Sequence, residues 1–349
     1  MAKIIIVGAG LSGLMTAYKL RHSNFEMTIL EARDRSGGRI YTETKDSNSL
    51  ELGATWFGPQ HVNLLNLVND LQVSYKTQEN GREALYDFRP KGHLERFKLP
   101  TKQAPTYKFK HGTNTLTNAL YEKLNTTVHF NQAVESVHFG NQIKVKTKSG
   151  ECIEGDYLVM SIPPQLAIDT IDFDPELPIG IKDLMQNTHT WMSDSIKFSC
   201  AFTNDFWKND SYTGTLMSPQ QIIQEMYDHS DADSSQKALV GFLNSKFSKH
   251  TKEERETKVL DYLKSMFGGE ASTFSYADVD WRKEEHTIDK YAKNLVPHQN
   301  NGHSKLRESL FGGRLFFSAS ETASQTPGYM DGAVHRGQEV AEHLLNQLA

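Results

Sequence analysis

Residues 8–13, GAGLSG, place three glycines in the spacing G-x-G-x-x-G directly after an apolar stretch. In this spacing Gly8 permits a tight turn, Gly10 lets the backbone approach a pyrophosphate, and Gly13 lets a following helix pack against the strand. The first N–H groups of that helix favour a phosphate group. The motif predicts a dinucleotide site, and the alternative is a purely structural glycine turn.

An acidic residue at a suitable distance strengthens the dinucleotide interpretation. Glu31 lies 18 residues after Gly13, at the end of a second apolar stretch. A carboxylate there can accept hydrogen bonds from both hydroxyls of a ribose, and its charge disfavours a 2′-phosphate. If the glycine turn were only structural, Glu31 would be an ordinary exposed acid.

The sequence EARDRSGGRI extends the motif beyond Glu31. Gly37 and Gly38 are followed by Arg39, and a guanidinium beside a close backbone approach suits a diphosphate. A dissociable NAD does not need this extension, so the pattern favours a permanently bound FAD. The alternative for Arg39 is a surface ion pair.

The surrounding periodicity indicates how these residues are positioned. The apolar runs 3–7 and 27–31, with a helical pattern between them, predict a βαβ unit in a parallel sheet buried on both faces. Residues 76–109 are polar and are predicted to be irregular, forming a crossing between subdomains. Alternation with a Gly140-Asn141 turn predicts antiparallel strands after residue 128. Further strands are expected at 157–162, 195–202, 238–243 and 314–320, and a helix ends the chain.

The length of 349 residues favours two cores. The predicted fold class is α/β: a Rossmann-like FAD-binding domain, with a parallel sheet, helices and a β-meander, plus a smaller α+β substrate domain. The FAD-binding domain is expected to be discontinuous, comprising residues 1–75, 110–178 and 283–349. The substrate domain is expected to comprise residues 76–109 and 179–282.

Charge and composition exclude several classes of function. The formal charge of −5 offers no basic field for nucleic acid or anionic lipid. Cys152 and Cys200 are far apart without metal-ligand spacing, so neither a disulfide framework nor a zinc site is expected. No apolar run approaches the ~20 residues of a membrane span. The expectation is a soluble protein in the reducing cytoplasm, without metal.

Eight stretches in order resemble the flavin-containing amine oxidase family, the monoamine oxidase group: VGAGLSGL, EARDRSGGR, LELGATWFGP, HGTNTLTNAL, YLVMSIPP, SIKFSCAF, DVDWRKEE and ETASQTPGYMDGAV. The resemblance covers most of the chain and implies an FAD-dependent enzyme that oxidises an amine. The residues that it implies in FAD binding, besides the glycines, are Ser12, Glu31, Arg33, Arg39, Thr55, Val134, Trp281, Glu321 and Met330.

The same resemblance implies which residues take part in the reaction. Tyr291 and Tyr329 would flank the substrate nitrogen, and electron-rich rings attract a cation by about 0.5–2 kcal/mol each. Lys197 would help reduced flavin react with oxygen, although strict alternation in 195–202 favours a solvent-facing lysine. Trp56 would line the substrate entrance. For Trp56 and Trp281 the alternative is a core tryptophan, and for either tyrosine a half-buried ring.

Two departures from the family pattern affect the expectations. Lys290 stands before Tyr291, where mitochondrial members attach flavin through a cysteine, so FAD is expected to be noncovalent. The segment 76–109 is shorter than the family's substrate region, which leaves the substrate open. The partners expected are a small amine and O2. The alternatives are a renalase-like flavoprotein acting on a dihydropyridine, and a flavin-binding protein without turnover.

Overall fold

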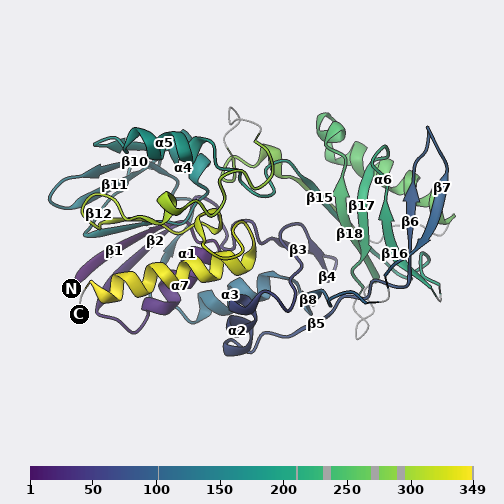
Figure 1. The fold of residues 1–349 in the computed structure, drawn as a ribbon, viewed down its shortest axis with the longest axis horizontal. Coiled ribbons are helices and arrows are strands. Elements are labelled where there is room, and N and C mark those ends of the chain that lie inside the picture. Colours follow the sequence, from purple (N-terminus) through teal and green to yellow (C-terminus); the bar gives the residue numbers. More distant parts are fainter. Residues whose placement is uncertain (101, 210, 231–236, 269–274, 289–294, 348–349) are drawn as a thin grey trace.

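A computed structural model describes residues 1–100, 102–209, 211–230, 237–268, 275–288 and 295–347. Figure 1 shows two lobes along the long axis, with both chain ends at the far end of one of them. The lobe that holds the termini is built on a parallel sheet, and the other lobe on a separate, largely antiparallel sheet.

The first lobe contains a five-stranded parallel sheet in the order β20-β13-β1-β2-β9. Its strands are β1 (Ala2–Val7), β2 (Phe25–Leu30), β9 (Val128–His129), β13 (Tyr157–Met160) and β20 (Leu315–Phe317). This sheet confirms the predicted Rossmann-like class. Because β1 and β2 are joined through helix α1 (Leu11–Leu20), the glycine loop lies at the carboxyl end of β1.

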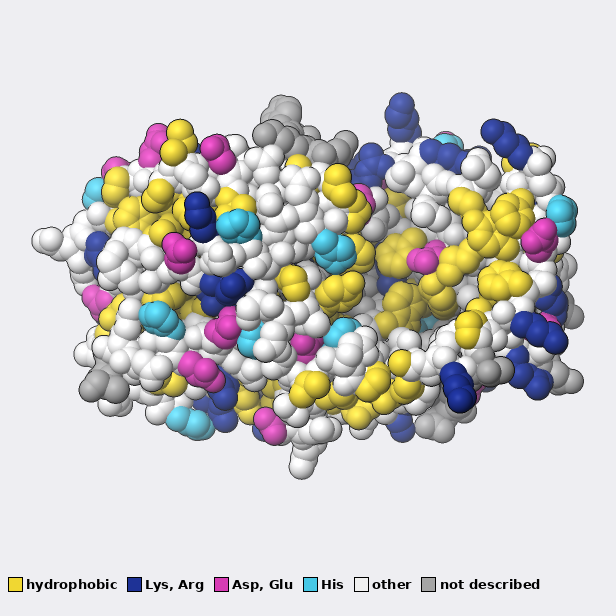
Figure 2. Space-filling view, viewed as in Figure 1, with side chains coloured by type: hydrophobic (Ala, Val, Ile, Leu, Met, Phe, Trp, Pro, Cys, Tyr) yellow, Lys and Arg dark blue, Asp and Glu magenta, His cyan; other side chains and the backbone are white. Residues whose placement is uncertain are grey.

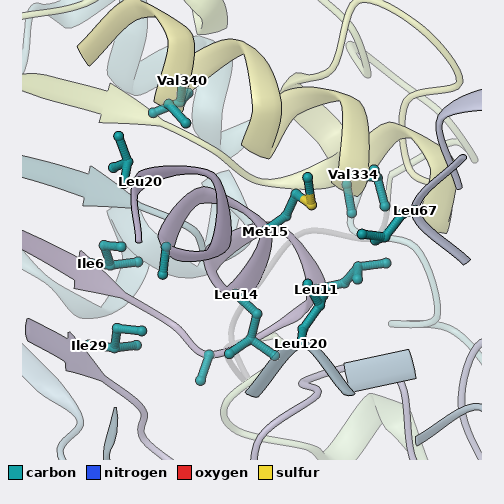
Figure 3. Close-up of a cluster of buried hydrophobic side chains, with 14 of the residues drawn as sticks. Ile6, Leu11, Leu14, Met15, Leu20, Ile29, Leu67, Leu120, Val334 and Val340 are labelled. Carbon is teal, nitrogen blue, oxygen red and sulfur yellow. The ribbon is translucent and has the colours of Figure 1, made fainter. Parts of the chain in front are cut away.

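Alternate residues of these strands point to opposite faces of the sheet and pack in two different hydrophobic cores. Ile4 and Ile6 pack in the core formed with α1, α2 (Val62–Asp70), α3 (Asn114–Glu122) and α7 (Met330–Asn346). Figure 3 shows Ile6 among the packed side chains of this core. Helix α7 lies directly on α1. A Cβ at Gly337 of α7 would stand 2.7 Å from the carbonyl oxygen of Ser12, so a glycine is required for this close contact.

The opposite face of the parallel sheet is covered by the predicted β-meander. Ile5 and Val7 pack against β10 (Val134–Phe139) and β11 (Ile143–Thr147), which pair with β12 (Cys152–Gly155) and β14 (Asp172–Asp174). Helices α4 (Pro164–Thr170) and α5 (Ile179–Gln186) complete this layer. The parallel sheet is therefore buried on both faces, as its apolar strands predict.

The second lobe is a seven-stranded sheet in the order β19-β15-β18-β17-β16-β6-β7. Helix α6 (Lys252–Phe267) covers one face, and Thr251 and Glu254 form a capping box at its start. The strands are β6 (Glu83–Asp87), β7 (Leu94–Lys98), β15 (Ile196–Phe202), β16 (Tyr212–Met217), β17 (Ile223–Asp228), β18 (Lys237–Leu243) and β19 (Ser275–Asp280).

The prediction that 76–109 is irregular was wrong. Besides β6 and β7, strands β5 (Tyr75–Thr77) and β8 (Tyr107–Phe109) pair with each other. The sequence signal is weak because β7 is an edge strand whose five side chains are all exposed, so no apolar alternation marks it.

The proposed domain boundaries stay a prediction. The seven-stranded sheet draws its strands from 83–98 and 196–280. Helix α5, which the sequence grouped with the substrate domain, contacts α4 and packs in the core of the first lobe.

Within the described ranges, no helix combines the length and the apolar character that crossing a membrane requires. The same ranges contain no group of three or more His, Cys, Asp or Glu side chains suited to a metal ion.

Candidate functional site

A cavity of about 200 Å³ lies at the carboxyl ends of β1 and β2. It is bounded by the glycine loop, by the start of α7 and by the meander, so it brings together segments from both ends of the chain. Most of the residues predicted to bind the cofactor line it: Gly8, Gly10, Ser12, Glu31, Arg33, Gly38, Arg39, Val134 and Met330.

The glycine loop has the geometry that the motif predicts. Gly8 has a φ of +103°, and a Cβ at Gly13 would lie 2.0 Å from the carbonyl oxygen of Gly8. Gly10 differs, because a Cβ there would meet nothing within 4 Å and Gly10 lines the cavity. Helix α1 has no side-chain cap, so its first N–H groups are available to an anion.

Glu31 is held in a fixed orientation just after β2. Its side chain is buried, and its Oε2 accepts a hydrogen bond of 2.8 Å from the Ala9 amide. Oε1 accepts one of 2.9 Å from the amide of Arg33. Each carboxylate oxygen can accept more than one hydrogen bond, so the edge of Glu31 that lines the cavity retains capacity for ribose hydroxyls. Glu31 is thus not the exposed acid of the alternative interpretation.

Arg39, whose side chain is 20% exposed, forms an ion pair with a fully buried carboxylate rather than a surface pair. Both of its terminal nitrogens contact the Glu321 carboxylate, and Nη2 lies 2.9 Å from Oε2. Nη1 also donates to the carbonyl oxygen of Trp191 at 3.1 Å. Burial acts to raise the pKa of Glu321, but the guanidinium offsets this, and the pKa ends below its ordinary value. Glu321 therefore contacts Arg39, which lines the cavity, but does not itself line the cavity.

A second cavity of about 510 Å³ separates the first from the seven-stranded sheet. The two cavities share Trp191, Tyr329 and Met330 among their lining residues. Figure 2 shows a hollow between the two lobes in which hydrophobic side chains gather. Thr55, Trp56 and Lys197 line this second cavity. Thr55, predicted to bind the cofactor, therefore lines the second cavity and not the first.

Lys197 is buried, contrary to the alternation of its strand. All seven residues of β15 are buried, because α6 covers one face and hairpin β3–β4 (Thr42–Lys45 and Asn48–Glu51) lies against the other. The Nζ of Lys197 donates to Thr55 Oγ1 at 3.2 Å, and it lies 4.3 Å from the ring centroid of Trp56 and 4.5 Å from that of Phe242. Burial lowers the pKa of Lys197 to about 8.

Tyr329 is the N-cap residue of α7 and is partly exposed at the junction of the two cavities. Its ring stacks on that of His298, with centroids 5.7 Å apart, and on Trp191 at 6.2 Å. Trp191 and His298 also stack on each other at 5.1 Å. Tyr291 lies outside the described residues, so the predicted tyrosine pair stays a prediction.

The structure does not bring two other predicted residues to the cavities. Gly13 is packed against Gly8 beneath the loop. Trp281 is fully buried, lines neither cavity, and donates from Nε1 to the carbonyl oxygen of Leu52 at 2.7 Å. It is a core tryptophan whose hydrogen bond to Leu52 holds the segment that precedes Thr55.

Two residues of the site were missed by the sequence interpretation. Trp191 lies in a polar loop six residues before Lys197, and a lone tryptophan in such a loop was the available signal. Glu225 on β17 is the single acidic side chain among the described residues that line the second cavity. Local sequence around Glu225 gives no signal, because its place in the cavity depends on strand pairing.

The pairing places Glu225 and Lys197 on one face of the sheet. Lys197 is opposite Phe242 on β18, and Phe242 is opposite Glu225 on β17. With about 4.8 Å between strands, the two Cα atoms lie roughly 10 Å apart. The second cavity therefore has a lysine on one side, a carboxylate two strands away, and aromatic rings between and around them.

The parallel sheet, the glycine loop and the buried acid after β2 define a dinucleotide-binding protein of the Rossmann class. A family model described as flavin containing amine oxidoreductase matches residues 11–105 and 91–345. The chain belongs to this family, which confirms the resemblance seen in the sequence and identifies the protein as an oxidoreductase of the flavoprotein type.

Similar proteins span nearly the whole chain. It is 24% identical to a flavin-containing amine oxidase of Danio rerio, covering 98% of this chain and 85% of the relative. It is 25% identical to amine oxidase A of Equus caballus, covering 100% and 86%. The solved structures of putrescine oxidase bound to putrescine and of cyclohexylamine oxidase from Brevibacterium oxydans share the fold. Each has a TM-score of 0.83 and covers 99% of both chains, at 22% and 17% identity respectively.

Proposed function

We propose that the protein binds FAD noncovalently in the first cavity and oxidises an amine in the second. The observation that carries this proposal is the shared wall of the two cavities, which includes Trp191, Tyr329 and Met330. It puts the start of α7 and an aromatic surface where a flavin ring would meet a substrate. Acid precipitation should release all flavin into the supernatant, because Lys290 replaces the cysteine of covalent members.

The residues of the first cavity fit an extended dinucleotide. Gly10 and the uncapped start of α1 would hold the diphosphate, and Glu31 would hold the adenosine ribose. Val134 would contact the adenine. Arg39, held by Glu321, would add positive charge near the phosphates, and the Met330 amide at the start of α7 would face the flavin oxygen.

FAD, when bound, would supply an acceptor for a hydride equivalent from the α-carbon of the amine, and O2 would take up the two electrons to give H2O2. The chain's own residues would bind and orient the substrate. The aromatic rings of Trp56 and Tyr329, with Tyr291 as the proposed partner of Tyr329, would bind the amine and exclude water. Lys197 would hold positive charge beside the developing negative charge of the oxygen reaction. Water would hydrolyse the imine product to an aldehyde or ketone and ammonia.

Mixing the flavin-loaded protein with substrates in the absence of oxygen tests the function. Bleaching of the flavin absorbance by simple amines is the expected result. Bleaching only by reduced nicotinamides would support the renalase-like alternative, and no bleaching by any compound would support a flavin-binding protein without turnover.

The position of Glu225 indicates that the proposed substrate carries a second cationic group. Glu225 is the single acid among the described residues that line the second cavity, so it can form a charge-assisted hydrogen bond with a cation there. Its position away from Lys197 suits a cationic group remote from the reacting amine. Putrescine oxidase, one of the structural neighbours, was solved with a diamine. We therefore propose that diamines are preferred over monoamines of the same length.

Glu225→Gln tests this preference with little change in volume. The expected result is a 10- to 100-fold lower kcat/KM for diamines, since a hydrogen bond to a charged group contributes about 1.5–3 kcal/mol. The kcat/KM for a monoamine of equal length should stay within about twofold of the unsubstituted protein, which serves as the matched control. Equal losses for both substrates would show that Glu225 supports the cavity and does not recognise a second cation.

A further inference from the structure

Large apolar side chains are exposed together at the outer end of the seven-stranded sheet. Ten such side chains are exposed among the described residues, and three of them, Phe88, Leu94 and Phe97, lie on β7 and on the turn that joins β6 to it. Figure 2 shows hydrophobic and basic side chains gathered at this end, which β6 and β7 form in Figure 1. Clustered exposed apolar side chains mark an interaction surface, whereas single ones are ordinary.

Phe88 and Phe97 lie on the face of the sheet that borders the second cavity. Phe97 is directly opposite Ala84, and Phe88 stacks on Tyr86 with ring centroids 4.1 Å apart. Ala84 and Tyr86 are two residues apart on one strand, so they point to the same face. Tyr86 is opposite Met217, which lines the second cavity. The exposed rings therefore continue outward from the mouth of that cavity.

Leu94 lies on the other face of the sheet. It is opposite Asp87, whose carboxylate accepts a hydrogen bond of 2.8 Å from Tyr262 of α6. The exposed apolar side chains thus stand on both sides of the edge strand. A rigid protein surface laid on one face would leave the other uncovered, whereas a lipid surface can surround both.

The outer edge of β7 limits how deeply this end of the sheet could enter a lipid layer. The Leu99 amide donates to the carbonyl oxygen of Arg82 at 2.9 Å, so the backbone groups of Leu94, Arg96 and Lys98, at the alternate positions, face away from β6. Strand β7 is the last in its sheet, and backbone groups without a strand partner are not tolerated in hydrocarbon. They can bind water and phosphate oxygens, so the headgroup layer is the depth that fits.

The net charge of the whole chain conceals a local excess of positive charge. Residues 88–102, called the hairpin end, contain five basic residues and one acidic residue, Glu95. This is a formal charge of +4 in a chain of −5, which leaves −9 on the rest. Arg89 pairs with Asp87 at 2.8 Å, and Arg96 with Glu83 at 3.0 Å. The other three basic side chains are exposed and form no ion pair with the described residues: Lys91, Lys98 and Lys102.

We propose that the hairpin end docks on the headgroup layer of an anionic lipid bilayer. Its lysines bind the lipid phosphate and carboxylate groups, and Phe88, Leu94 and Phe97 enter between the headgroups. The negative charge on the rest of the chain orients the molecule, because the same lipid surface repels it. The docking goes beyond the proposed function and does not require it.

Sedimentation of the full chain with vesicles tests the docking. The vesicles contain phosphatidylcholine alone or an equal mixture of phosphatidylcholine and phosphatidylserine. The affinity for the mixed vesicles is expected to be at least about 10-fold higher. It should be lost when the salt concentration is raised from about 0.1 M to 1 M, because salt screens the lysine charges. Failure to bind the mixed vesicles at low salt would overturn the proposal.

Two triple substitutions separate the apolar and the basic contributions: Phe88→Ser with Leu94→Ser and Phe97→Ser, and Lys91→Gln with Lys98→Gln and Lys102→Gln. Each should weaken binding to the mixed vesicles at least about 10-fold. Denaturant unfolding checks that each variant is folded, and Leu94→Ser alone, with a smaller expected loss, serves if the triple variant is not. Full binding by the folded serine variants would reduce the hairpin end to a non-specific basic surface and contradict the docking.

Ile179→Ser is the matched control for the loss of an exposed apolar side chain. Ile179 is 80% exposed at the start of α5, in the other lobe. This variant should bind the mixed vesicles within about twofold of the unsubstituted protein. A loss as large as that of the serine variants would place the lipid contact elsewhere and overturn the proposal.

Duplex DNA distinguishes a lipid surface from other polyanions. It presents phosphates without an apolar layer beneath them, so the affinity for DNA should be at least about 10-fold lower than that for the mixed vesicles. Equal affinity for both would show that the hairpin end binds any polyanion, and would overturn the assignment to lipid. None of these measurements uses turnover, so their outcome is distinct from a failure of amine oxidation.

Discussion

Lys197→Met is expected to slow the reaction of reduced flavin with oxygen by about 100-fold, while flavin reduction by an amine changes by less than about fivefold. The reason is the loss of a buried positive charge whose only direct hydrogen bond among the described residues goes to Thr55. Stopped-flow absorbance measures the two half-reactions separately. Lys91→Met, in an exposed loop, is the control for the loss of a lysine. Unchanged oxygen kinetics would remove Lys197 from the mechanism.

The oxygen reaction should also depend on pH in a defined direction. Burial lowers the pKa of Lys197 to about 8, so the charged form is present below this pH and is lost above it. The rate constant for reoxidation is therefore expected to fall as the pH rises through about 8. Lys197→Met should show no such fall.

The same substitution should make the protein more stable at neutral pH. A pKa lowered from 10.5 to about 8 means that the folded state disfavours the lysine charge by about 3 kcal/mol at most. This cost is present below pH 8 and disappears as the pH rises towards 10.5, because the unfolded chain holds the proton through that window. Denaturant unfolding of the FAD-free variant should thus show a gain at pH 7 that shrinks by pH 10.

The first cavity was predictable because its determinants are local. Gly8, Gly10 and Gly13 act within one loop, and Glu31 follows at a fixed spacing on the next strand. Each requirement is a matter of backbone conformation or of a strand end, which a short stretch of sequence specifies. Arg39 was partly predictable, but its pairing with Glu321 joins residues far apart in the chain.

The second cavity depends on contacts that no short stretch specifies. Strand β15 alternates like a half-exposed strand, yet Lys197 is buried because β4 and α6 cover the two faces of its sheet. Glu225 enters the cavity only because β17 and β15 both pair with β18.

Alanine substitutions of two glycines in one loop should have opposite effects on folding and binding. Gly10→Ala should fold normally, since Gly10 has a φ of −72° and a ψ of 176°, which alanine adopts, and its Cβ would enter open space. Its stability without FAD should be equal or higher by about 0.4–1 kcal/mol. FAD binding should weaken at least about 10-fold, because the added methyl group occupies the space in which a diphosphate would approach.

Gly13→Ala should instead destabilise the protein itself by about 3 kcal/mol or more, because its Cβ would lie 2.0 Å from the carbonyl oxygen of Gly8 and backbone must move. Denaturant unfolding of the FAD-free proteins and titration with FAD measure the two properties independently. If Gly10→Ala retained full FAD affinity, the diphosphate could not lie against this loop, and the proposed orientation of the cofactor along the first cavity would be wrong. If Gly13→Ala were as stable as the unsubstituted protein, the contact between α1 and β1 would be looser than the structure describes.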